Sequence, residues 1–590
     1  MLTDKLDHRQ FKIFFYLILL LGIALRIFGL NWDQSQHLHP DERFLTMVTT
    51  AIKMPPGLAN YFNTGKSTLN PHNHNFNFYV YGTFPLLITR MVTELLNATD
   101  YGRIFLVGRL LSAFFDTGTL LLTGFLACLL FRQKAIGLWA AFFYAIAVFP
   151  VQQAHFFTVD SFTVFFSTLT LLLTVLFLEK KSLTRLASAG FFFGLSLANK
   201  TSVGITLPIF LLVISLAQSR PKKTGEWRQF LTTAASRILL FGLSSFLAFR
   251  IFQPYAFTGL FALSPRFRQN ISDAHKMITG EIDYPPNIQW THTRPLLHPL
   301  FNLFFFGLGP AFSFLSLTGI VILGKTKEKK LLPLFLLIAF ALIVFFYQGI
   351  QLAKYMRYFY PLYPLLAILA GLASHQLATV KQKRFFVLGM SLSFLSFIWI
   401  VSFLSLYTRP HSRVTASEWI YQQIPAGAVL TCEEWDDALP LPLPGFTKNY
   451  QILSLALYAP ETMIKWQKIT RQLAQADYII LSSNRLWESI PRLPQRYPVT
   501  TLYYQLLFDG SLGFKKVAQF SSPPCLRVRQ STLWCWPEDK AEESFTVYDH
   551  PKVIIFKKTD FNEKMLLPLL DQSLIQKASS LNPKETNKLF

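Results

Sequence analysis

The stretch His37-Leu38-His39-Pro40-Asp41-Glu42-Arg43-Phe44 lies just beyond the first apolar run of the sequence, residues 13–30. It therefore stands at a boundary between membrane and water, and it sets two carboxylates side by side. A general base has to be held at a fixed depth, partly desolvated, with a pKa near the working pH. Asp41 and Glu42 are placed where a lipid-carried substrate would lie, and they are our candidates for catalytic residues. The alternative is that they belong to an ordinary solvated loop.

The composition indicates a membrane protein with many spans. Of 590 residues, 51% are hydrophobic and 59 are Phe, and the apolar residues gather in runs of nearly twenty. No soluble core needs such runs. The net charge of +23 does not indicate nucleic-acid binding, because Lys and Arg lie in short clusters between the apolar runs. We expect the lipid bilayer, and no nucleic acid, as a partner.

Eleven apolar runs are predicted membrane helices, so the predicted fold class is an α-helical polytopic membrane protein. The first run is predicted to be retained, because no small-residue cleavage site of a signal peptide follows it. The runs cover residues 13–30, 104–131, 135–151, 157–178, 184–199, 203–218, 235–252, 303–323, 331–348, 359–378 and 385–407.

Basic residues orient these helices. By the positive-inside rule, connections rich in Lys and Arg are cytoplasmic, which places the N-terminus in the cytoplasm and the loop of Asp41 and Glu42 outside. An odd number of spans puts the residues after 407 outside as well. We therefore predict a multi-pass protein of the plasma (inner) membrane. The basic clusters occupy every second connection, at 132–134, 180–185, 220–228, 325–330 and 381–384.

Three regions are predicted. Residues 1–407 form a membrane module, with long outer loops at about 31–103 and 253–302. Residues 408–565 form an extracytoplasmic α/β domain, and residues 566–590 form a flexible tail. Within the α/β domain, Cys525 and Cys535 either pair or remain free thiols. Its predicted elements are a helix at 415–423 and strands at 428–431, 478–481 and 553–556.

Polar residues near the outer boundary lead to two further predictions. Residues 77–97 form an amphipathic helix in the membrane interface, with Arg90 and Glu94, spaced i, i+4, on its wet face. Arg109 and Asp116 are costly in lipid, must face protein, and are interpreted as a structural buried pair.

The second outer loop, residues 253–302, is rich in Pro, His and aromatic residues. Such a loop is either an ordered lid or a simple connector, and long loops are usually functional. The candidates for a lid or for acceptor binding are Tyr284, Trp290, His292 and Arg294.

Short motifs follow one another in a specific order along most of the chain. They are Pro40-Asp41-Glu42, Tyr81 to Leu86 (Tyr-Gly-Thr-Phe-Pro-Leu), Gly108-Arg109-Leu110, His155 to Asp160, Gly194 to Lys200, Arg357 to Pro364, Glu434 to Pro440, and Asp549 to Lys557. This order resembles the GT-C superfamily of polyprenyl-phosphate-sugar-dependent glycosyltransferases. The nearest branch is the bacterial one related to protein O-mannosyltransferases and lipid A aminoarabinose transferases.

The resemblance implies transfer of a sugar from a polyprenyl-phosphate donor to a protein, lipid or glycan acceptor on the outer face of the membrane. Asp41 would activate the acceptor nucleophile, and Glu42 would orient it or bind a cation. Asp160 opens a helix after an outer turn and could enter the same site. Its alternative role is that of an N-cap carboxylate.

Displacement of a polyprenyl phosphate also requires cations at the outer boundary. The candidates are Arg357, Lys354 and Lys200, with Arg109 and Arg294 behind them. Lys354 and Arg357 lie i, i+3 and could share a face. The alternative for either one alone is a side chain that snorkels to the interface. Phe84 stands before Pro85, where the aminoarabinose branch carries Lys, so we assign no phosphate contact to that helix.

The need for a metal stays open. Glu42, Asp160 and His155 could hold a divalent cation, although isolated histidines at a membrane interface are more often packing residues. The sequence has no Gly-rich phosphate loop, which argues against a nucleotide and for a lipid-linked donor.

Two other classes of protein also have many spans. A secondary transporter or lipid flippase should show internal repeats and broken helices at the midplane, and neither is evident in the sequence. A non-catalytic envelope-assembly scaffold would have no need of Asp41 and Glu42. Sugar transfer by the purified protein from a polyprenyl donor separates all three.

Overall fold

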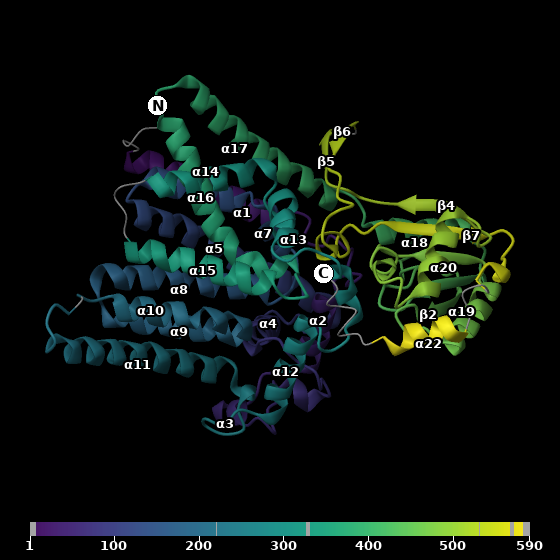
Figure 1. Ribbon diagram of the computed structural model, residues 1–590, viewed down its shortest axis with the longest axis horizontal. Coiled ribbons are helices and arrows are strands. Elements are labelled where there is room, and N and C mark those ends of the chain that lie inside the picture. Colours follow the sequence, from purple (N-terminus) through teal and green to yellow (C-terminus); the bar gives the residue numbers. More distant parts are fainter. Residues whose placement is uncertain (1–6, 220, 326–330, 530, 567–571, 582–590) are drawn as a thin grey trace.

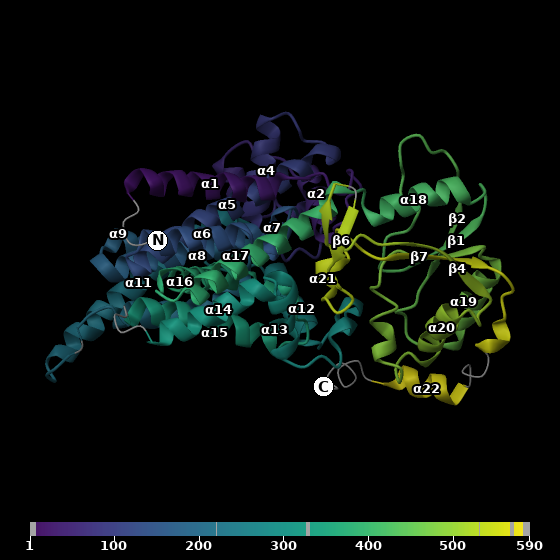
Figure 2. The ribbon, with the colours of Figure 1, turned by 90° about the horizontal axis from the view of Figure 1, so that it is seen from above.

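The computed structural model describes residues 7–219, 221–325, 331–529, 531–566 and 572–581. A bundle of long helices forms one part of the molecule, and a smaller domain built on a β-sheet stands at one end of it (Figures 1 and 2). The elements of the bundle are α1 (His8–Ile27), α5 (Tyr101–Phe131), α6 (Lys134–Ala145), α7 (Val148–Ala154), α8 (Asp160–Lys180), α9 (Leu183–Asn199), η2 (Thr201–Thr206), α10 (Leu207–Leu216), α11 (Glu226–Phe252), α13 (Leu297–Asn302), η5 (Leu303–Gly307), α14 (Pro310–Lys325), α15 (Leu331–Gly349), η6 (Met356–Leu362), α16 (Tyr363–Thr379), α17 (Lys383–Leu404) and η7 (Ser405–Thr408).

All eleven predicted spans fall on helices of this bundle, which confirms a polytopic helical protein. Among the described residues, seven helices are long and apolar enough to cross a membrane, and two bent pairs bring the number to nine. The pairs are α6 with α7, bent by 59°, and α13–η5 with α14, bent by 118°. The other two predicted spans are shorter helices, α9 and η2–α10. The count of eleven spans therefore stays a prediction.

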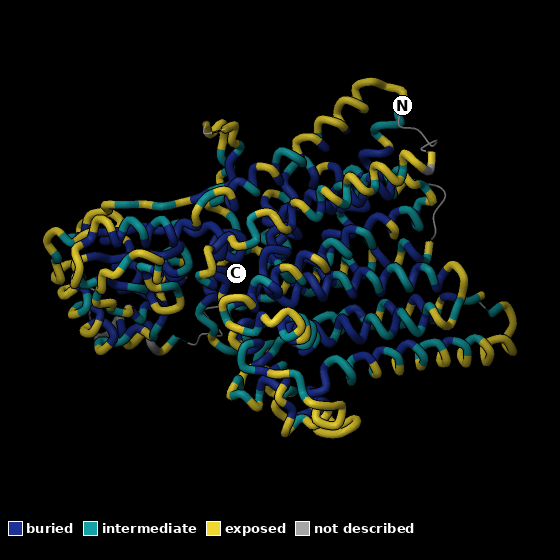
Figure 3. The backbone as a smooth tube through the Cα atoms, turned by 180° about the vertical axis from the view of Figure 1, so that it is seen from behind, coloured by how far each residue is buried: buried dark blue, intermediate teal, exposed yellow. Residues whose placement is uncertain are grey.

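The outer helices of the bundle present apolar side chains to their surroundings. Exposed residues follow the periphery of the bundle in Figure 3, and on α11 and α17 they include Leu239, Leu243, Phe394 and Leu395. A soluble protein would bury such large side chains, whereas a lipid bilayer solvates them.

The first long outer loop folds into short helices at the end of the bundle that carries the sheet domain. In it, α4 has 13 residues, too few to cross a hydrocarbon core of about 30 Å. Arg90 and Glu94 form an ion pair of 2.7 Å. Their predicted position on a wet face is wrong for Arg90, which is buried and donates to the carbonyl oxygen of Thr49 at 3.1 Å. The elements of the two outer loops are α2 (Pro40–Ala51), α3 (Leu58–Phe62), η1 (Pro71–His74), α4 (Thr83–Leu95), η3 (Pro254–Ala256), α12 (Pro265–Thr279) and η4 (Pro285–Trp290).

The predicted pair between Arg109 and Asp116 does not form. Seven residues along a helix correspond to a rise of about 10 Å, which is too far for an ion pair. Asp116 instead binds Arg26 of α1 at 2.6 Å and accepts a hydrogen bond from Tyr144 at 2.5 Å. It also accepts one from Tyr360 of η6. This buried network joins α1, α5, α6 and η6 inside the bundle.

The C-terminal domain contains a five-stranded sheet in the order β2-β1-β3-β7-β4. β1 runs parallel to β2 and β3, whereas β7 is antiparallel to β3 and β4. A separate hairpin, β5–β6, is closed by a disulfide between Cys525 and Cys535. The elements are α18 (Ser412–Gln423), β1 (Val429–Glu433), β2 (Gln451–Leu455), α19 (Met463–Gln475), β3 (Tyr478–Leu481), η8 (Ile490–Arg492), α20 (Pro498–Asp509), β4 (Phe514–Phe520), β5 (Cys525–Val528), β6 (Ser531–Cys535), α21 (Glu543–Thr546), β7 (Val553–Lys558), η9 (Glu563–Met565) and α22 (Gln572–Ser580).

The sheet domain is packed onto the bundle. The largest buried cluster contains Phe143 and Phe403 of the bundle together with Leu430 and Ile555 of the sheet. Within the predicted flexible tail, residues 572–580 form α22, and most of the remaining tail lies outside the described residues.

Candidate functional site

The motif Pro40-Asp41-Glu42 begins α2. His39 is the N-cap residue, and its ring nitrogen Nδ1 accepts a hydrogen bond from the backbone N–H of Glu42 at 3.3 Å. Pro40 occupies the first helical position, where its missing N–H costs nothing. Asp41 and Glu42 therefore lie in the first turn, where the helix dipole favours negative charge.

Glu42 is directed into the bundle. Its two carboxylate oxygens accept hydrogen bonds from Arg109 at 2.6 and 2.9 Å, and one of them also accepts from the backbone N–H of Phe157 at 2.8 Å. Arg109 binds Asp33 at 3.0 Å as well, and its guanidinium lies 4.8 Å from the ring centre of Trp32. Because all three charged side chains are fully buried, Glu42 anchors α2 to α5.

Asp41 is directed toward η6 and is bound by the guanidinium of Arg357. The hydroxyl of Tyr81 forms a second hydrogen bond to it. Burial alone would raise the pKa of Asp41, but Arg357 outweighs burial and the pKa falls to about 2. Burial lowers the pKa of the neighbouring His39 to about 4. At neutral pH, Asp41 is therefore ionised and His39 is neutral.

Tyr81 is held in place by the segment that leads into α4. The backbone N–H of Gly82 donates to the carbonyl oxygen of Asn199 at 3.0 Å. A Cβ atom at Gly82 would lie 2.0 Å from the carbonyl oxygen of Ala198, so only glycine permits this approach. The Tyr-Gly-Thr-Phe-Pro-Leu motif thus fixes one of the two hydrogen-bond partners of Asp41.

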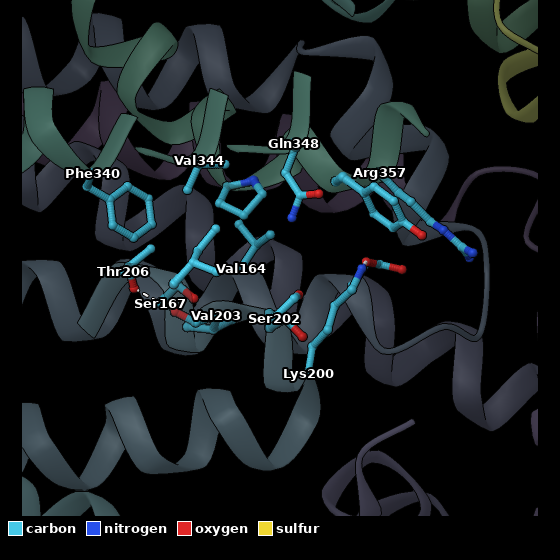
Figure 4. A pocket seen from close by; sticks show the side chains of 15 residues that line it. Val164, Ser167, Lys200, Ser202, Val203, Thr206, Phe340, Val344, Gln348 and Arg357 are labelled. Atoms are coloured by element: carbon cyan, nitrogen blue, oxygen red, sulfur yellow. Dashed lines mark hydrogen bonds and ion pairs between the residues drawn. The ribbon is translucent and has the colours of Figure 1, made fainter. Parts of the chain in front are cut away.

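Asp160 and Lys200 form a second ion pair, with Lys200 Nζ 2.7 Å from the carboxylate. Both line a cavity that Arg357 also lines, and Lys200 lies 4.8 Å above the ring centre of Tyr358 (Figure 4). The cavity continues between α8, η2 and α15, where valine, isoleucine and phenylalanine side chains line it together with serine, threonine and glutamine. Figure 4 shows Phe340 at the end opposite Arg357.

Lys354 lies elsewhere. η6 begins at Met356, so Lys354 precedes the helix and shares no helical face with Arg357. Its ammonium group is buried and donates to the carbonyl oxygen of Leu352 at 3.1 Å and to Thr293 Oγ1 at 3.4 Å. Burial lowers its pKa to about 8.

The four candidates of the second outer loop divide into two pairs. Tyr284 lies near Asp41, and its ring packs edge-on against Trp435 with 5.7 Å between centres. Trp290 is buried and packs against Tyr355, with 4.3 Å between ring centres. The ring of Tyr355 in turn lies below the guanidinium of Arg357. His292 and Arg294 are exposed.

The three candidate metal ligands do not fit a divalent cation. Both ring nitrogens of His155 contact backbone carbonyl oxygens, those of Val151 at 2.7 Å and Phe28 at 2.8 Å, so no lone pair is free for a metal. Glu42 is bound by Arg109 and Asp160 by Lys200. Over the described ranges, no group of three or more His, Cys, Asp or Glu side chains is arranged to hold a metal.

Several residues near Asp41 are not predicted from the sequence. Tyr548 of the C-terminal domain packs on His39 with 4.1 Å between ring centres. Arg43 of α2 binds Asp437 at 2.6 Å. Only the Glu434 to Pro440 and Asp549 to Lys557 motifs pointed toward this region, because contacts across several hundred residues leave no spacing signal in one sequence.

The comparisons with known proteins agree with this architecture. Residues 85–248 match the family model of dolichyl-phosphate-mannose-protein mannosyltransferase. No curated protein matches the chain.

Three solved structures are similar in fold. That of the Archaeoglobus fulgidus oligosaccharyltransferase in the apo form has a TM-score of 0.51 and 14% identity, and covers 87% of this chain and 74% of that chain. The structure of the same protein in complex with zinc and sulfate has a TM-score of 0.50 and 14% identity, and covers 87% of this chain and 72% of that chain. The structure of ArnT from Cupriavidus metallidurans bound to undecaprenyl phosphate has a TM-score of 0.41 and 14% identity, and covers 81% of this chain and 94% of that chain.

The family match and the fold confirm the predicted resemblance to the GT-C superfamily. The fold also confirms the predicted fold class, a helical polytopic protein with a C-terminal domain that contains a sheet, and the family match agrees with the predicted glycosyltransferase activity.

Proposed function

We propose that this GT-C chain transfers a sugar from a polyprenyl-phosphate donor to a protein, lipid or glycan acceptor, at the end of the bundle that carries the C-terminal domain. The proposal rests on the contact of Asp41 with Arg357. A carboxylate suited to deprotonate an acceptor is joined there to a cation suited to hold a phosphate. A part-buried contact of this kind, next to a cavity, is more useful for chemistry than for stability.

The donor phosphate would bind between Arg357 and Lys200, which line the same cavity. A phosphodiester carries one negative charge and two unesterified oxygens, which Arg recognises through parallel hydrogen bonds. The phosphate would share these cations with their present partners, Asp41 and Asp160. The polyprenyl chain would follow the apolar side chains that lead toward Phe340.

In the reaction, Asp41 would take the proton from the acceptor hydroxyl or amine as that oxygen or nitrogen forms its bond to C1 of the sugar. The bond between C1 and the phosphate oxygen breaks, and its electron pair leaves with the polyprenyl phosphate. Arg357 and Lys200 would stabilise the charge that develops there.

The other candidate residues would act by positioning Asp41, Arg357 and Lys200 or by facing the acceptor. Glu42 would be a positioning residue, because it fixes the first turn of α2 to Arg109. Asp160 would orient Lys200, and Trp290 would support Arg357 through Tyr355. Tyr284 would face the acceptor. Lys354 would brace the loop before η6, since its ammonium group does not line the cavity.

We further propose that the N-terminus is cytoplasmic, that residues 1–407 form the membrane module of the plasma (inner) membrane, and that residues 408–565 form an extracytoplasmic domain. The start of α1 at the end of the bundle away from the sheet domain supports this orientation (Figure 1). The Cys525–Cys535 disulfide supports an oxidising compartment for the C-terminal domain.

The test is transfer of radiolabel by the purified protein in lipid nanodiscs, from undecaprenyl-phosphate hexoses to a cell-envelope extract. We expect transfer by the wild type and a loss of at least about a hundredfold in Asp41→Asn, because a general base contributes that much. Asp100→Asn, which alters an exposed carboxylate of the same outer loop, should transfer normally. Movement of the donor lipid across the bilayer of proteoliposomes, without transfer of the sugar in either preparation, would overturn the proposal in favour of a flippase.

A further inference from the structure

A second cavity of about 260 Å³ lies between the start of α2 and the C-terminal domain. It shares no lining residue with the cavity of Lys200 and Arg357. Asp41 lies between the two cavities without lining either: its partner Arg357 lines the first, and Pro40 and Tyr548, both close to Asp41, line the second. A transferase that joins two substrates needs two such approaches to one base.

The second cavity is bordered by the carboxyl ends of two parallel strands. β1 has β2 on one side and β3 on the other. The connection that leaves β1 leads to β2, and the connection that leaves β3 leads to β4 at the opposite edge, so the two diverge between β1 and β3. In open α/β sheets, ligands bind in the crevice at this switch point. Residues 434–437 follow β1 and residues 482–485 follow β3, and Trp435, Asp437 and Arg485 from these segments line the cavity.

The two segments are linked to each other and to the membrane module. Arg485 Nη1 donates to the carbonyl oxygen of Trp435 at 2.8 Å, and Ser483 donates to Asp436. Asp437 accepts from Arg413 at 2.7 Å and from Arg43 of α2 at 2.6 Å. The wall of the cavity is thus preorganised, which lowers the cost of binding a ligand.

Trp435 is the unusual residue of this wall. It is 47% exposed and its backbone lies in the left-handed region, with φ of +78°. A bulky residue in that conformation is strained, and such strain tends to persist where function requires it. Its ring packs edge-on against Tyr284 and lines the cavity, where it offers an aromatic surface to a ligand.

The chemistry of the wall favours a sugar. A saccharide ring has an apolar face that suits an aromatic platform, and hydroxyls that both donate to carboxylates and accept from guanidinium groups. A lipid tail would meet five charged side chains in this cavity, at a high cost of desolvation. The lining charges are Arg43, Arg413, Asp436, Asp437 and Arg485.

We propose that this cavity binds the acceptor and that the acceptor is a saccharide, whose ring stacks on Trp435 while one hydroxyl reaches Asp41. The inference rests on the proposed function, and it narrows the acceptor to a glycan or the sugar headgroup of a glycolipid. The acceptor hydroxyl would give its proton to Asp41 and its oxygen to C1 of the donor sugar, as the polyprenyl phosphate departs.

The experiment measures binding of soluble tri- and tetrasaccharides of glucose, mannose, N-acetylglucosamine and galacturonate to the full chain in nanodiscs, by saturation-transfer NMR. Nanodiscs replace sugar-based detergents, which would compete. We expect Trp435→Ala and Trp435→Leu to weaken binding about tenfold and Trp435→Phe to retain most of it, because the aromatic face provides the contact. Trp534→Ala is the matched control, since Trp534 is 49% exposed on β6 and does not line the cavity.

Binding of undecaprenyl phosphate, followed in parallel, separates the two proposals. We expect it to be unchanged in Trp435→Ala. If the wild-type protein does not bind undecaprenyl phosphate, the proposed function is contradicted. Normal binding of undecaprenyl phosphate with no saccharide bound, or with equal saccharide affinity in Trp435→Ala and Trp435→Phe, would overturn the saccharide acceptor alone. Binding of a Ser/Thr-rich peptide library that depends on Trp435, where the saccharides do not bind, would assign the cavity to a protein acceptor. It would also overturn the saccharide acceptor.

Discussion

The carboxylate of Asp41 accepts a hydrogen bond from the guanidinium of Arg357, which lies 316 residues farther along the chain. The proposed base and the proposed phosphate ligand are therefore in direct contact before any substrate binds. A phosphate that draws on Arg357 weakens the interaction that keeps the pKa of Asp41 low. Donor binding would thus make Asp41 a stronger base, and the donor would control when the acceptor is activated.

Replacement of Arg357 tests its role toward the phosphate. We expect Arg357→Ala to raise the KM for a polyprenyl-phosphate donor by about 10- to 100-fold, the range for one lost charge-assisted hydrogen bond. Arg357→Lys should recover part of this, because it keeps the charge and loses the paired geometry. Donor titration of the transfer rate in nanodiscs provides the measurement. An unchanged KM in Arg357→Ala would remove Arg357 from the phosphate site.

Lys200 and Lys354 offer a direct comparison between two cations of the outer boundary. Lys200 lines the donor cavity, whereas the ammonium group of Lys354 is buried beneath Leu352 and Thr293. We expect Lys200→Met to weaken binding of undecaprenyl phosphate by about tenfold, and Lys354→Met to leave it within about twofold. Both are measured by tryptophan fluorescence. The reverse order would return Lys354 to the phosphate site.

This contrast shows what one sequence can and cannot predict. The long helices of the bundle are visible as apolar runs, and β1, β3 and β7 as buried runs, because lipid and the protein core both select apolar residues locally. β2 and β4 escape prediction because most of their side chains are partly or fully exposed.

The partners of charged residues depend on the folded chain. Their position at the outer boundary makes Lys200, Lys354 and Arg357 equal candidates in the sequence, yet only Lys200 and Arg357 line the cavity. Arg109 was assigned to Asp116 because both lie on one helix, and the fold pairs it with Glu42 instead. Nothing in the spacing of residues encodes these long-range choices.

The pH dependence of the reaction tests the contact of Asp41 with Arg357. In the free enzyme, the pKa of Asp41 is lowered to about 2, so kcat/KM for the donor should show no acid limb from this group above about pH 4. In the donor complex, Arg357 is shared with the phosphate, and the acid limb of kcat should move to higher pH. Rate profiles between pH 4 and 8 measure both. If the acid limbs of kcat/KM and of kcat coincide, the bound donor does not change the pKa of Asp41.

Glu42 and Asp41 are neighbours with different expected effects on stability. Glu42→Gln removes one of the two carboxylates that compensate the buried Arg109, and breaking a buried ion pair costs about 3 kcal/mol or more. Asp41 is part-exposed, so Asp41→Asn should lower the free energy of unfolding by less. Thermal unfolding in nanodiscs compares the two. Greater destabilisation by Asp41→Asn would contradict the anchoring role of Glu42.

The orientation of the C-terminal domain can be tested through its disulfide. Cys525 and Cys535 are paired, and the other two cysteines, Cys128 and Cys432, are free. In a variant carrying Cys128→Ala and Cys432→Ser, a membrane-impermeant maleimide should not label intact cells until an impermeant reductant has opened the disulfide. The expected labelling after reduction follows from an extracytoplasmic, oxidising location of the hairpin. Labelling that requires lysis of the cells, with or without the reductant, would place the domain in the cytoplasm. It would also place the Asp41–Arg357 contact on the cytoplasmic side, since both residues lie at the same end of the bundle as this domain.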